Sequence, residues 1–111
     1  MRVTVLYKKI TPKEFFDIRS KKNNWQLLDV REKEEIEIAR LPNSIFIPMN
    51  DVKSRIEELN KEKPIAVICR SGIRSAEIAK FLVSRSFADV ANIEGGINEW
   101  SDTVDKKILK Y

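Results

Sequence analysis

The chain has 111 residues, of which 42% are hydrophobic and 34% are charged, and its formal net charge is +4. This size and composition predict one soluble globular domain, residues 1–111, that buries its own core. The chain has no histidine and a single cysteine, which excludes an internal disulfide, a histidine-dependent catalytic pair or triad, and the usual zinc sites.

Basic and acidic residues are interleaved along the chain, so we expect a solvated surface and no nucleic-acid binding. No apolar run is long enough to cross a membrane, and the apolar part of the N-terminus is too short for a signal peptide. A lone thiol that carries chemistry needs a reducing compartment, so we predict a cytoplasmic location and no membrane partner.

The first half of the chain alternates β-prone and helix-prone segments. Thr11 to Glu14 has the form of a capping box with proline at the first helical position, which predicts a helix start. The predicted strands in this half are 3–7, 25–30 and 44–47, and the predicted helical segments are 12–21 and 31–40.

The alternation continues in the second half. Val52, Ile56 and Leu59 are at helical spacing, which predicts a helix from Asn50 or Asp51 to about Asn60. The remaining predicted strands are 65–68 and 90–93, and the remaining predicted helices are 75–85 and one that starts at residue 97. This order predicts an α/β fold with a parallel central sheet and helices on both faces.

The chemistry is predicted at the loop after the wholly apolar run Ile65–Ile68, where the chain reads C-R-S-G-I-R-S. Gly72 permits a tight turn, and the loop N–H groups and the next helix can face one anion. Arg70 and Arg74 add two permanent positive charges. We therefore interpret Cys69 as a nucleophile held partly or wholly as thiolate, against the alternative of a small buried residue that ends a core strand.

Four motifs resemble the rhodanese family of sulfurtransferases. The loop that starts at Cys69 resembles its active-site loop, and L-L-D-V-R-E at residues 27–32 resembles its N-terminal strand motif. Residues 35–44 occupy the place of a second motif, although Ala39-Arg40 and Asn43-Ser44 replace its usual Gly-His and Gly-Ala pairs. G-G-I-N-E-W at residues 95–100 resembles the closing motif.

The resemblance implies a three-layer rhodanese-like sandwich and a sulfurtransferase that carries sulfur as a persulfide on Cys69, with no metal or organic cofactor. Arg74 would hold the sulfonate of thiosulfate, and Arg70 would steer it to the loop. Asp29 and Arg31 would support the loop structurally. The residues that would bind the substrate are Arg70, Ser71, Gly72, Ile73, Arg74 and Ser75.

The implied substrates are thiosulfate or a persulfide donor. The motifs and the final tyrosine also resemble the rhodanese domain of adenylyltransferases that supply sulfur to ubiquitin-like carriers. That resemblance implies a cysteine desulfurase or a ubiquitin-like sulfur carrier as protein partners.

Two other functions are compatible with a nucleophilic cysteine. The domain could be a carrier that passes sulfur between proteins and has little activity on thiosulfate. A phosphatase or arsenate reductase is the third hypothesis. In tyrosine phosphatases the loop between the cysteine and the arginine is one residue longer. The arginine of such a loop would fall on Ser75 here, so the loop length favours sulfur over phosphorus.

Overall fold

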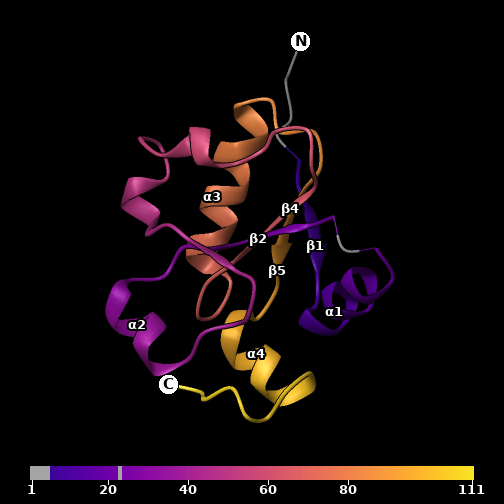
Figure 1. Cartoon of the computed structure of the whole chain (residues 1–111), viewed down its shortest axis with the longest axis vertical. Helices are drawn as coiled ribbons and strands as arrows, with labels where there is room; N and C mark the ends of the chain where they lie inside the picture. Colours follow the sequence, from indigo (N-terminus) through magenta and orange to yellow (C-terminus); the bar gives the residue numbers. More distant parts are fainter. Residues whose placement is uncertain (1–5, 23) are drawn as a thin grey trace.

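The computed structural model describes residues 6–22 and 24–111, which form an α/β fold with one central sheet (Figure 1). The strands are β1 (Lys8–Ile10), β2 (Gln26–Asp29), β3 (Ile45–Phe46), β4 (Ile65–Ile68) and β5 (Val90–Ile93). The helices are α1 (Pro12–Lys21), α2 (Lys33–Ile38), α3 (Ile73–Ser84) and α4 (Gly96–Thr103), with two 3₁₀ turns, η1 (Met49–Asp51) and η2 (Ile56–Glu58).

The sheet is five-stranded and parallel throughout, in the spatial order β1-β5-β4-β2-β3. Its middle strand, β4, is buried along its whole length. Ile65 and Val67 belong to the core on one face of the sheet, and Ala66 and Ile68 to the core on the other. This division follows from the two-residue period of a strand, and it explains why β4 is an unbroken apolar run.

Helices cover both faces of the sheet, as Figure 1 shows. Phe15 of α1 and Trp100 of α4 lie in the core of one face, with their ring centroids 6.1 Å apart. On the other face, the buried side chains of α3 include Ile78, Ala79 and Leu82. The prediction of a parallel sheet between two helical layers is confirmed. No helix of the described residues is long and apolar enough to span a membrane.

Local signals located α1 correctly, and the chain turns at Pro42 and Asn43. The Thr11 side chain accepts a hydrogen bond from the Glu14 N–H at 3.1 Å, and the Glu14 carboxylate accepts one from the Thr11 N–H at 2.9 Å. Asn43, which stands where the family usually has glycine, adopts a left-handed conformation with φ of 59°. Asparagine tolerates this conformation better than most residues, so the turn after Leu41 is preserved.

The first strand differs from its prediction. Residues 3–5 lie outside the described residues, and Leu6 and Tyr7 are not in a strand. β1 instead pairs Lys8 with Ala91 and Ile10 with Ile93 on β5. Ile10 is the buried residue of this edge strand, and burying its side chain fixes the register of β1 on β5.

The predicted helix at residues 50–60 is wrong. This segment contains η1, η2 and turns, although Val52 and Leu59 are buried as their spacing indicated. The Ser54 hydroxyl donates to the Asp51 carbonyl oxygen at 3.0 Å, beside the backbone hydrogen bond from the Arg55 N–H to the same oxygen. Because a short segment gains little from helix propagation, the burial of two side chains decides its path.

Candidate active site

The cysteine loop lies at the carboxyl end of β4, between the ends of β2 and β5. Cys69 follows β4 directly, and Gly72, with φ of 105°, is the residue before the first turn of α3. α3 therefore begins at Ile73, two residues before the predicted start. In a parallel sheet the carboxyl ends of neighbouring strands share one edge, so residues that follow β2 and β5 meet this loop.

The Cys69 sulfur is surrounded by hydrogen-bond donors from its own loop. Sγ accepts a hydrogen bond from the Gly72 N–H at 3.1 Å and one from the Ser75 N–H at 3.5 Å. The Ser75 Oγ is 3.3 Å from the same sulfur. Cys69 and Ser75 are buried, with 1% and 0% of their surface exposed. N–H groups that converge on one atom at a helix N-terminus favour negative charge there.

The first turn of α4 donates hydrogen bonds to the backbone of the cysteine loop. The Ile97 N–H donates to the Cys69 carbonyl oxygen at 2.9 Å, and the Asn98 N–H donates to the Arg70 carbonyl oxygen at 3.2 Å. A Cβ on Gly96 would overlap the Cys69 carbonyl oxygen and lie 2.5 Å from the Arg70 carbonyl group. Gly96 therefore permits this approach, and the predicted closing motif gains a physical role beside the cysteine.

Asn92 is a loop contact that the sequence analysis missed. It lies on β5 and is 1% exposed. Its Nδ2 donates to the Gly72 carbonyl oxygen at 3.1 Å and to the Glu94 carboxylate at 2.6 Å. The signal was present, because Asn92 is the one polar residue in the otherwise apolar run of β5.

Asp29 and Arg31 form a buried ion pair at the end of β2. Arg31 donates from Nη2 to Asp29 Oδ2 at 2.8 Å and from Nε to Oδ1 at 3.0 Å, and both side chains are 0% exposed. Arg31 also donates to the Ala39 carbonyl oxygen at 2.6 Å. Burial acts to lower the pKa of Arg31, but the hydrogen bonds and charge of Asp29 outweigh it and raise that pKa. Both residues are therefore fixed in place, as a supporting role requires.

Arg74 lies on the first turn of α3 and is paired with Glu35 of α2. Nη1 and Nη2 donate to the two carboxylate oxygens at 2.6 and 2.8 Å. The hydrogen bonds from Arg74 hold the pKa of Glu35 down at about 2, although burial opposes this. The reciprocal interaction raises the pKa of Arg74, which also interacts electrostatically with Cys69. The family resemblance implies that Arg74 holds the sulfonate of thiosulfate, and in the structure the Glu35 carboxylate holds the same guanidinium.

Tyr111, from the C-terminal tail, contacts both Glu35 and Arg31. The sequence of this tail has no strong structural pattern. The Tyr111 hydroxyl donates to Glu35 Oε2 at 2.7 Å and accepts from Arg31 Nη1 at 3.1 Å. The Arg70 guanidinium carbon lies 4.9 Å from the centre of the Tyr111 ring. Burial, together with the hydrogen bond to Glu35, raises the pKa of Tyr111 and outweighs Arg31. The largely exposed segment 32–37 therefore contributes one half-buried carboxylate, that of Glu35, to the site.

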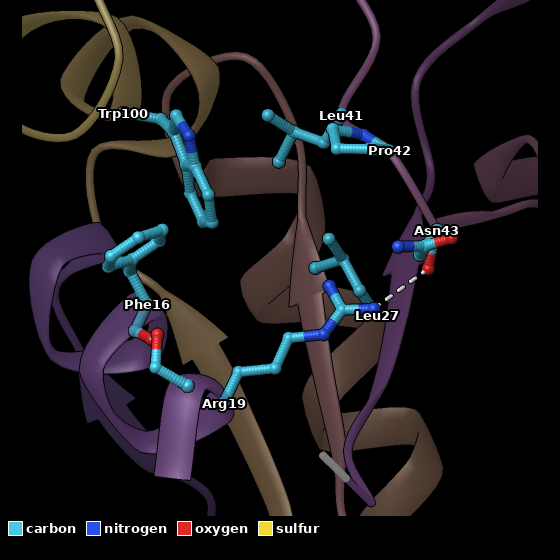
Figure 2. A pocket seen from close by; sticks show the side chains of 8 residues that line it. Phe16, Arg19, Leu27, Leu41, Pro42, Asn43 and Trp100 are labelled. Carbon is cyan, nitrogen blue, oxygen red and sulfur yellow. Dashed lines mark hydrogen bonds between the residues drawn. The ribbon is translucent and has the colours of Figure 1, made fainter. Parts of the chain in front are cut away.

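A cavity of about 270 Å³ lies elsewhere, beside α1, β2 and the loop at residues 41–43 (Figure 2). Phe16 and Trp100 line it from the helices, and Arg19 reaches along it to donate to the Asn43 carbonyl oxygen at 3.1 Å. None of the Cys69 loop residues lines this cavity. Within the described residues, no group of three or more Asp, Glu, Cys or His side chains is arranged to hold a metal ion.

The fold and the loop together define an α/β domain built around one cysteine in a cradle of N–H groups. The family model of the rhodanese-like domain matches residues 11–103. The chain therefore belongs to the rhodanese family. The resemblance inferred from the four motifs is confirmed.

Relatives of two kinds support the assignment. The chain is 32% identical to the adenylyltransferase and sulfurtransferase UBA4 of Candida albicans over 93% of its own length, and it spans 25% of that protein. It is 28% identical to the thiosulfate sulfurtransferase GlpE of Pseudomonas syringae, with 94% of this chain and 96% of that protein covered. A crystal structure of a rhodanese-like domain protein from Staphylococcus aureus matches with a TM-score of 0.81 and 29% identity, covering 94% of this chain and 98% of the other.

Proposed function

We propose that the domain moves a sulfane sulfur from thiosulfate or a persulfide donor to a thiophilic acceptor, by way of a persulfide on Cys69. The observation that carries this proposal is the Gly72 N–H, which donates to the Cys69 sulfur at 3.1 Å, with Ser75 on the same atom. Donors placed around the sulfur stabilise a thiolate before the reaction and a persulfide anion after it.

The first half-reaction balances without a separate base. With thiosulfate, the Cys69 thiolate forms a bond to the outer sulfur, the S–S bond of thiosulfate breaks, and its electron pair leaves with sulfite. A thiophile then attacks the outer sulfur of the Cys69 persulfide and regenerates the thiolate. Thiolate attack on sulfur needs no general base when the thiol is already ionised.

The other loop residues have supporting roles in this scheme. The backbone of Ser71 and Ile73 completes the turn whose Gly72 and Ser75 N–H groups face the sulfur. Arg70 is exposed and attracts the anionic donor, and Arg74 adds a second positive charge beside the loop. The buried Asp29–Arg31 pair fixes the neighbouring strand end.

We also propose a cytoplasmic location, because the thiol of Cys69 is free. A cysteine desulfurase or a ubiquitin-like sulfur carrier is proposed as the protein partner, because the chain is similar to UBA4.

The test is sulfur transfer from thiosulfate to cyanide, together with the intact mass of the protein after incubation with each donor. We expect the wild type to gain one sulfur atom and Cys69→Ala to gain none. Arg74→Ala, which removes a positive charge near Cys69, is expected to raise the thiosulfate concentration needed for half-maximal rate. Sulfur transfer that persists in Cys69→Ala would contradict the proposal. A wild type that accepts sulfur only from a protein persulfide would instead favour the carrier function.

A further inference from the structure

The guanidinium of Arg74 is already occupied by the protein itself. Both of its terminal nitrogens donate to Glu35, at 2.6 and 2.8 Å, in the paired geometry that a guanidinium would also use for a sulfonate. The side chains of Arg74 and Glu35 are 33% and 19% exposed. The pair is therefore partly shielded from water but lies within reach of a ligand.

Further contacts keep Glu35 in this position. The Tyr111 hydroxyl donates to Oε2 of the same carboxylate at 2.7 Å. Arg31 Nη1 donates to the Glu35 carbonyl oxygen at 3.3 Å and to the Tyr111 hydroxyl at 3.1 Å. Arg31 is itself held by Asp29, so a buried ion pair orients the groups that hold Glu35 on Arg74.

This arrangement changes the charge that a donor meets. The loop carries two arginines, Arg70 and Arg74, and Glu35 neutralises one of them. Thiosulfate is a dianion, and its sulfonate must displace the Glu35 carboxylate to gain the paired hydrogen bonds of Arg74. An organic persulfide, R–S–SH, has no sulfonate. Its transferred sulfur needs only the N–H cradle around Cys69, so Glu35 does not compete with it.

We propose that Glu35 is a specificity-determining residue which, by occupying Arg74, makes the site favour organic persulfides over thiosulfate as sulfur donors. This inference rests on the proposed sulfur transfer through Cys69. In the favoured step the Cys69 thiolate forms a bond to the terminal sulfur of the donor. The S–S bond of the donor breaks, its electron pair leaves with the thiolate R–S⁻, and the proton of the terminal sulfur stays on the new persulfide or passes to water.

The test uses Glu35→Gln, which keeps the size of the side chain and removes the charge that competes for Arg74. The matched control is Glu34→Gln, because Glu34 is exposed on the same helix and its replacement changes the net charge equally. The initial rate of sulfur gain at Cys69 is followed by intact mass, over a range of concentrations of thiosulfate or of mercaptoethanol persulfide.

In Glu35→Gln we expect the half-saturating thiosulfate concentration to fall roughly fivefold, the size of effect typical of a partly exposed ion pair. The half-saturating concentration of mercaptoethanol persulfide should not change, and Glu34→Gln should match the wild type with both donors. The wild type should load faster from mercaptoethanol persulfide than from thiosulfate at equal concentration.

An unchanged response to thiosulfate in a folded Glu35→Gln protein overturns the inference, as does an equal shift for both donors or a wild type that prefers thiosulfate. If Glu35→Gln does not fold, Tyr111→Phe removes one of the hydrogen bonds that hold Glu35 and should shift the thiosulfate response in the same direction by a smaller factor. An unchanged half-saturating thiosulfate concentration in Tyr111→Phe also overturns the inference. A wild type that gains sulfur from neither donor refutes the proposed function itself, which distinguishes the two failures.

Discussion

Asp29 and Arg31 are two residues apart in sequence and form an ion pair that is closed to solvent, with Nη2 2.8 Å from Oδ2. Such a pair is costly to break, because removing one partner leaves the other charge buried without compensation. It lies at the end of β2 and also contacts α2 and the tail through Ala39 and Tyr111.

Arg31→Ala should therefore lower the free energy of unfolding by about 3–5 kcal/mol, the usual cost of leaving a buried charge unpaired. Lys13→Ala is the control, because the Lys13–Asp17 pair is 60% and 54% exposed and its loss should change little. Urea denaturation of both variants measures the difference. Equal stability of Arg31→Ala and the wild type would show that the buried pair is not needed for folding.

Gly96→Ala should reduce sulfur transfer as well as stability. The new methyl group would overlap the Cys69 carbonyl oxygen, and the residue has a positive φ of 60°. Gly95→Ala is the matched control, since it has a similar strain at φ of 79° but meets the Glu99 side chain instead of the loop. We expect both variants to melt earlier, but only Gly96→Ala to load sulfur more slowly in the fraction that is folded. Equal loading rates would argue against the role of α4 in positioning Cys69.

The ion pair between Glu35 and Arg74 predicts a pH dependence of stability. The pKa of Glu35 is depressed from its ordinary value of 4.5 to about 2, so its contribution is present above pH 4.5 and is lost as the pH falls toward 2. The difference in melting temperature between wild type and Glu35→Gln should be largest near neutral pH and shrink below pH 4.5. A difference that stays constant from neutral pH to pH 2.5 contradicts the assigned cause.

Ser75→Ala tests the side-chain hydrogen bond between Ser75 and the reactive sulfur. The variant keeps the Ser75 N–H and removes the Oγ that lies 3.3 Å from Cys69 Sγ. Loss of one hydrogen bond of about 1 kcal/mol predicts roughly fivefold slower sulfur loading. Ser84→Ala, which removes an exposed hydroxyl at the far end of the same helix, should load like the wild type. If both variants load at the same rate, the Ser75 hydroxyl has no part in the reaction.

Sequence patterns succeeded where a contact is local. The strands at 65–68 and 90–93 are buried along their whole length because helices cover both faces of the sheet, and apart from Asn92 their residues are apolar, so their predicted bounds match the structure. The capping residues of α1 interact within one turn, so its bounds also match. The helix predicted at 50–60 failed because the spacing of its buried residues was correct while the backbone between them forms 3₁₀ turns.

By itself the sequence determined the parallel α/β fold and the place of Cys69 after the middle strand, because periodicity and turn chemistry act over a few residues. Only the tertiary structure decided what surrounds the loop. Glu35 reaches Arg74 across 39 positions and Tyr111 reaches Glu35 across 76, which no local pattern encodes. The carboxyl edge of a parallel sheet gathers such distant segments, so partners of the loop are set by strand order and not by spacing along the chain.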